Sequence, residues 1–68
     1  MTELIFLVEP ALEGGWTARG LGQSVFTEAD SLSELRENVR DAVACHFEPH
    51  ETPSVIRLHI VTEEVLAA

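Results

Sequence analysis

The sequence predicts a small α+β domain in the order β-β-β-α-β, with a four-stranded sheet of order 3-2-1-4 and one helix on one face. Three observations lead to this prediction. An apolar run without alternation, Leu4–Val8, opens the chain, and an alternating run, Ser54–Thr62, follows near its end. Only Ser31–Phe47, between them, has a complete helical pattern. The 68 residues have no repeat and no linker, so residues 1–68 are expected to form a single domain.

The first two strands are expected to form a hairpin. Both faces of Leu4–Val8 are apolar, which is typical of a central strand covered on both sides. Pro10 and the pair Gly14-Gly15 then favour a turn. Trp16–Arg19 would return antiparallel to the first strand, with Trp16 and Ala18 on one face.

A short third strand, Gln23–Thr27, is expected before the helix. Ser31 and Glu34 have the spacing of a capping box, in which the Ser31 hydroxyl accepts a hydrogen bond from the Glu34 amide. Pro49 removes a backbone donor, so the helix should end by about that point. The apolar stripe of this helix consists of Leu32, Leu35, Val39, Ala42, Val43 and Phe47.

A right-handed crossover through the helix would place the last strand parallel to the first and beside it. One helix, about 10 Å wide, can cover only part of one face of four strands spaced about 4.8 Å apart. We therefore expect the other sheet face, or the free edge of the last strand, to be covered by a second copy or by a partner. The residues suggested for this interface are Trp16, Arg57 and His59.

Composition excludes several classes of protein. Twelve acidic residues and four basic ones give a net charge of −8, which disfavours direct binding to nucleic acid. This charge favours a basic protein partner. The alternative is that the acidic residues only keep the domain soluble. No stretch is long and apolar enough to cross a membrane, and the N-terminus lacks the positive start of a signal peptide. A single cysteine, Cys45, fits the cytoplasm.

The chemistry-bearing side chains do not form a recognisable site. Pro49 separates His46 from His50, which breaks the helical spacing of a metal pair, and no second pair supplies more ligands. His46 is expected to pack its ring within the apolar stripe. Cys45 and His46 point about 100° apart on a helix, so they do not predict a nucleophile and its base. We expect no catalytic residues, no metal and no cofactor.

Three features resemble the N-terminal domain of HicB-type antitoxins. The apolar strand ending in Glu9-Pro10 and followed by Glu13–Ala18 is similar to the family's acidic, glycine-containing hairpin with an aromatic residue after it. Phe26–Leu35 is similar to the family's threonine-containing approach to a helix that begins Asp-Ser/Thr-Leu-x-Glu. The strand after the helix also fits. The chain departs from the family pattern at Ala29, where glycine is common, and in 19–24. We expect no DNA-binding domain of the kind that follows this domain in the family.

The resemblance implies a truncated ribonuclease-H-like fold and self-association as a homodimer or a higher oligomer. It also implies that the protein neutralises a small basic HicA-like toxin that cleaves RNA, and that it does so by occlusion rather than catalysis. An alternative is a solitary HicB-like homo-oligomer with a regulatory or scaffolding role. A vestigial metal-dependent nuclease ranks third, since the first strand lacks the central acidic residue of the nuclease relatives.

Overall fold

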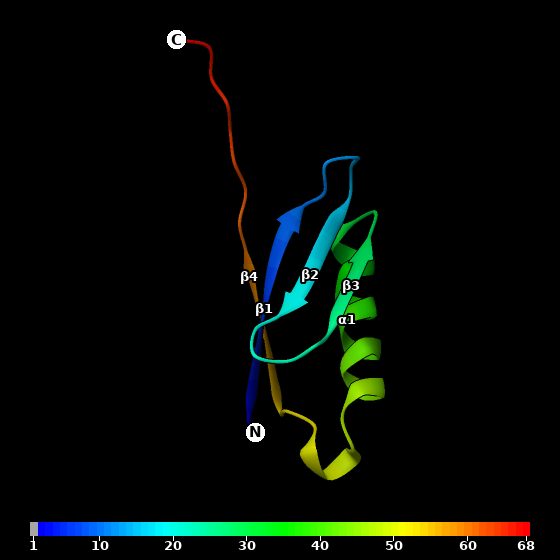
Figure 1. The fold of residues 1–68 in the computed structure, drawn as a ribbon. Coiled ribbons are helices and arrows are strands. Elements are labelled where there is room, and N and C mark those ends of the chain that lie inside the picture. The colour runs from blue at the N-terminus through cyan, green and yellow to red at the C-terminus, as the bar shows by residue number, and fades with distance from the viewer. Residues whose placement is uncertain (1) are drawn as a thin grey trace.

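The computed structural model describes residues 2–68 and has one sheet with one long helix packed on it (Figure 1). The sheet order is β3-β2-β1-β4, as the sequence predicts. The elements, in chain order, are β1 (Glu3–Pro10), β2 (Trp16–Gly20), β3 (Phe26–Ala29), α1 (Leu32–His46), the short 3-10 helix η1 (Pro49–Glu51) and β4 (Val55–Ile60).

Strand β1 lies at the centre of the sheet. It pairs antiparallel with β2, with Val8 opposite Ala18, and parallel with β4, with Phe6 opposite Leu58. Directly opposed residues share a face, so these four side chains all lie on the helix side. The central position explains why β1 is apolar on both faces.

Helix α1 begins and ends where the sequence predicts. The Ser31 hydroxyl accepts a hydrogen bond from the Glu34 amide at 3.1 Å. At the other end, Phe47 is extended and donates its N–H to the Val43 carbonyl at 3.2 Å, two residues before Pro49. The stripe between these ends faces the sheet, because Leu35, Val39 and Val43 are buried and the other stripe residues pack around them.

The core lies between α1 and the centre of the sheet. It contains no charged or polar residue among those described. The buried residues are Leu4, Phe6, Val8, Ala18, Val25, Leu35, Val39 and Val43. Each buried valine, leucine or phenylalanine side chain contributes about 1.5–3 kcal/mol, so this layer is the main source of stability.

Helix α1 does not lie over the middle of the sheet. It packs against β3 and β2 (Figure 1). A groove separates it from β4. As a result, Ile56 and Leu58 on the helix side of β4 are only half-buried, and Ile60 is exposed. The helix therefore leaves part of its own side of the sheet uncovered.

The third strand differs from the prediction. It spans Phe26–Ala29 rather than Gln23–Thr27, with Arg19 opposite Phe26 and Trp16 opposite Ala29. The reason is the turn before it: Gly22 has a φ of +83°, and the Gly20 amide donates to the Val25 carbonyl at 2.8 Å. Val25 thus closes the turn and enters the core instead of starting the strand.

The remaining strands agree with the prediction except at their ends. β1 runs from Glu3 to Pro10, where the proline takes the terminal position and needs no ladder donor. β4 is shorter than expected and ends at Ile60, although the Val61 amide still donates to the Val8 carbonyl at 2.9 Å. Residues 61–68 have no regular structure and continue away from the body in line with β4 (Figure 1).

Candidate partner-binding surfaces

The sheet face opposite α1 is bare in the described part of the chain. It is apolar at its centre, where Ile5 and Leu7 are half-buried, and apolar again at Phe26 and Val55, which are 60% and 48% exposed. No element between residues 2 and 68 covers this face (Figure 1). An uncovered sheet face with exposed apolar side chains is typical of a contact surface.

Arg57 and His59 lie on this open face, as the sequence suggests. Arg57 is opposite Ile5 and His59 is opposite Leu7. The Arg57 guanidinium donates two hydrogen bonds to one carboxylate oxygen of Glu3, at 2.8 and 3.2 Å. This pair is exposed, so it fixes the direction of Arg57 more than it stabilises the fold.

Trp16 does not lie on the open face, and the suggestion that placed it there is wrong. It shares the helix side of β2 with the buried Ala18, because side chains two residues apart in a strand point the same way. There it is half-buried and packs against the core. The three suggested interface residues therefore belong to two different surfaces.

Trp16 instead lines an acidic pocket of about 380 Å³ at the end of the sheet where α1 begins. Four of the other lining residues are acidic: Glu13, Glu28, Asp30 and Glu34. An indole ring attracts a cation over its face, and a guanidinium also forms charge-assisted hydrogen bonds with carboxylates. The pocket is therefore suited to an arginine or lysine side chain.

The hairpin turn brings Glu13 to this pocket. The Ala11 amide donates to the Gly15 carbonyl at 3.0 Å, and Gly15 has a φ of +80°. A side chain at Gly15 would start only 2.6 Å from the Ala29 carbonyl oxygen. Glycine is thus needed here for the hairpin to approach the β3–α1 connection.

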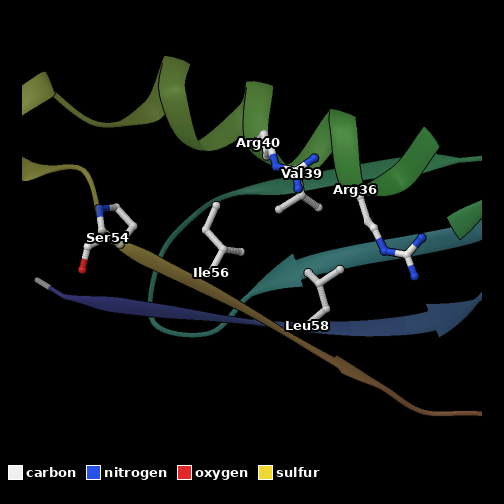
Figure 2. Close-up of a pocket in the computed structure, with 7 residues that line it drawn as sticks. Arg36, Val39, Arg40, Ser54, Ile56 and Leu58 are labelled. Atoms are coloured by element: carbon white, nitrogen blue, oxygen red, sulfur yellow. The ribbon is translucent and has the colours of Figure 1, made fainter. Parts of the chain in front are cut away.

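A second cavity, of about 450 Å³, is the groove between α1 and β4. Figure 2 shows Ile56 and Leu58 of β4 extending toward the helix. Helix α1 forms the opposite wall of the groove with Arg36, Val39 and Arg40. The floor is apolar and the helix side is basic. This groove thus differs in charge from the acidic pocket.

The three histidines and the cysteine do not all meet at one site. His46 is exposed rather than packed in the stripe, because α1 ends there, and its ring stands edge-on to that of Phe47, with centroids 4.8 Å apart. His46 and His50 line one shallow pocket, with Glu51. Across residues 2–68, no group of three or more His, Cys, Asp or Glu side chains is placed to hold a metal ion. Cys45 is exposed.

The two cavities were not predicted from the sequence. Glu13 and Asp30 lie in different turns, and only the pairing of Trp16 with Ala29 brings those turns to the same end of the sheet. The strand order alone could have predicted that the β1–β2 and β3–α1 connections lie next to each other. The off-centre position of α1, which opens the groove, has no comparable signal.

No helix among the described residues is long and apolar enough to span a bilayer.

Two relatives identify the family. A UPF0150 protein of Archaeoglobus fulgidus is 58% identical over 52 residues, which cover 76% of this chain and 77% of the relative. A UPF0150 protein of Thermotoga maritima is 31% identical over 65 residues, 96% of this chain and 91% of the relative. No family model matches the sequence, and no solved structure matches it at a significant level. The extent and identity of these matches show that the chain belongs to the UPF0150 family.

Proposed function

We propose that this protein is an antitoxin-type binding protein, which neutralises a small basic RNA-cleaving toxin by covering its active surface and without catalysis. The observation that carries the proposal is the acidic pocket, in which four acidic residues surround the half-buried Trp16. The resemblance of the hairpin and the helix approach to HicB-type antitoxins supplies the class of partner. The relation to the ribonuclease H fold is part of the same proposal.

Charge supports this function at two scales. The net charge of −8 attracts a basic protein over a distance and speeds its association. At contact, the pocket offers carboxylates and an aromatic face to one cationic side chain. Occlusion needs only such complementarity, and it needs no catalytic group on the antitoxin.

The test is co-expression with a small basic protein encoded beside this chain. We expect the wild-type chain to restore growth that the toxin arrests and to be recovered with the toxin in a pull-down. Asp30→Lys with Glu13→Lys should weaken recovery at least tenfold, because both carboxylates become repulsive. Asp41→Lys with Glu48→Lys changes the net charge equally at exposed positions outside the pocket and should have a much smaller effect.

If the two double variants weakened recovery of the toxin equally, net charge alone would explain binding. That result would contradict the acidic pocket as the binding site. Failure of the wild-type chain to bind or to neutralise its neighbour would contradict the function. That failure would favour the alternative of a solitary homo-oligomer with a regulatory or scaffolding role, which the unpaired edge of β4 also supports. The nuclease hypothesis is tested separately, by titration with magnesium or manganese, and we expect no binding.

A further inference from the structure

We infer that two copies of this chain join edge to edge through β4, as a two-fold symmetric antiparallel pair in which Ile60 faces Ile60 and Glu64, after β4, reaches the basic groove of the other copy. The inference does not depend on the proposed toxin partner. It rests on the edge of β4, on the segment that follows it and on the charge of the groove.

The outer edge of β4 is unpaired in the single chain, since β4 is the last strand of the sheet. The Val55 amide donates to Thr2 and the Val61 amide donates to Val8, both inward at 2.9 Å. Backbone groups of successive strand residues point to opposite edges. Those of Ile56, Leu58 and Ile60 therefore point outward, where they can pair with another strand.

The segment after β4 carries exposed apolar side chains. Val65 and Leu66 are 92% and 77% exposed, and Val61 is 36% exposed. The segment continues the direction of β4 instead of folding back on the body (Figure 1), so it offers further backbone to an antiparallel partner. Apolar side chains on such an extended segment gain from burial against a second molecule.

The charges on the two surfaces favour a second copy as the partner of β4 and favour one register of the strand pair. When Ile60 faces its own copy, Arg57 lies opposite Glu63 of the second copy, and Ile56 lies opposite Glu64 of the second copy. Side chains of opposed residues share a face, so Glu64 would project on the helix side, toward the groove lined by Arg36 and Arg40. Opposite charges then meet where two chains of net charge −8 would otherwise repel each other.

The same register also matches the apolar residues. Val65 of one copy falls opposite Val55 of the other on the open face, and the two Ile60 side chains meet on the helix side at the two-fold axis. Of the outward-facing residues, Ile56 pairs with residue 64, Leu58 with Thr62 and Ile60 with itself. The contact is reciprocal, as a two-fold interface requires.

Cross-linking tests the register. In a Cys45→Ser background, which removes the native thiol, Ile60→Cys should give a disulfide-linked dimer under mild oxidation. Hydrogen-bonded antiparallel partners have Cα atoms about 5.5 Å apart, within the range that a disulfide spans. Thr62→Cys is the matched control. Its two copies would lie four residues apart along the strands, about 14 Å, and should not cross-link.

Sedimentation of unlinked variants tests the edge itself. The wild-type chain should be a dimer at micromolar concentration. Thr62→Pro removes an outward N–H that the pair uses but that lies beyond β4, so it should convert the dimer to a folded monomer. Ala67→Pro, outside the paired residues, should leave the dimer intact.

Each outcome decides the inference. A dimer that Thr62→Pro dissociates and that Ile60→Cys alone cross-links supports it. A wild-type monomer, a dimer that survives Thr62→Pro, or cross-linking through Thr62→Cys in place of Ile60→Cys overturns it. Circular dichroism of each variant separates loss of the interface from loss of the fold.

Discussion

Phe6 and Phe26 have the same side chain in opposite environments. Phe6 is fully buried between β1 and α1, whereas Phe26 is 60% exposed on the open face. Phe6→Ala should therefore cost about 3–5 kcal/mol of unfolding free energy, because it leaves a cavity in a close-packed core. Phe26→Ala should cost less than about 1 kcal/mol in the monomer.

Urea denaturation of both variants measures this difference. A domain of this size has little stability in reserve, so Phe6→Ala is expected to be largely unfolded in buffer. Similar midpoints for the two variants would contradict the assigned core. Phe26 lies on β3, at the opposite edge of the sheet from β4, so pairing through β4 leaves it uncovered and the comparison can use the wild-type background.

Gly14 and Gly15 offer a second matched pair at residue scale. Both have positive φ, of 100° and 80°, so alanine is strained at either position. Only at Gly15 would the new methyl group meet another atom, the Ala29 carbonyl oxygen at 2.6 Å. Gly14→Ala should cost about 1–2 kcal/mol, and Gly15→Ala should cost clearly more.

Thermal unfolding followed by circular dichroism gives the comparison. Gly15→Ala should also weaken capture of the basic partner, because it moves the hairpin away from the acidic pocket. An equal loss of stability at the two glycines would show that the close approach to Ala29 does not contribute.

At the scale of single elements, α1 depends on its first turn. The Ser31 hydroxyl satisfies the Glu34 amide, one of the four amides that the helix cannot satisfy internally. Ser31→Ala should cost about 1 kcal/mol of unfolding free energy. Ser33→Ala, inside the helix and exposed, should be neutral or slightly stabilising, since alanine is the better helix former.

Chemical denaturation should thus show a lower midpoint for Ser31→Ala and an unchanged or slightly higher midpoint for Ser33→Ala. Two midpoints lowered by the same amount would mean that the serines act through general polarity and not through the cap.

The elements differ in how well the sequence predicts them. The helix and the central strand follow from local signals, a cap at Ser31 and an apolar run at Leu4–Val8, that no tertiary contact overrides. The third strand could not be located from such signals. Val25 is β-branched and apolar, which is typical of a strand. In the structure it closes the turn through Gly22 with its side chain in the core, and the pairing of β3 with β2 begins at Phe26.

The candidate binding surfaces could be located only from the arrangement of all the elements. Alternation along β2 was sufficient to place Trp16 with Ala18, but which side of the sheet the helix covers depends on the register of all four strands. Once that side is known, Trp16 belongs to the acidic pocket and Arg57 to the open face. The groove depends on the position of α1 over β3 and β2 rather than over β4, which periodicity cannot specify.

At the scale of the whole chain, the asymmetry of charge has a consequence for stability. Twelve acidic side chains and four arginines lie on one small body, and only two ion pairs, Arg40–Glu37 and Arg57–Glu3, are formed among the described residues. Both pairs are exposed and contribute about 0–1 kcal/mol each. Repulsion among the remaining carboxylates should therefore outweigh them.

Added salt should consequently stabilise the folded chain, because screening weakens the sum of repulsions more than it weakens two exposed pairs. We expect the urea midpoint of the monomeric Thr62→Pro variant to rise between low and physiological ionic strength. Asp41→Lys with Glu48→Lys, which reduces the negative charge by four units at exposed positions, should raise the midpoint at low salt and flatten its salt dependence. A midpoint that falls with salt in both proteins would instead show that the two arginine pairs contribute more than the repulsion does.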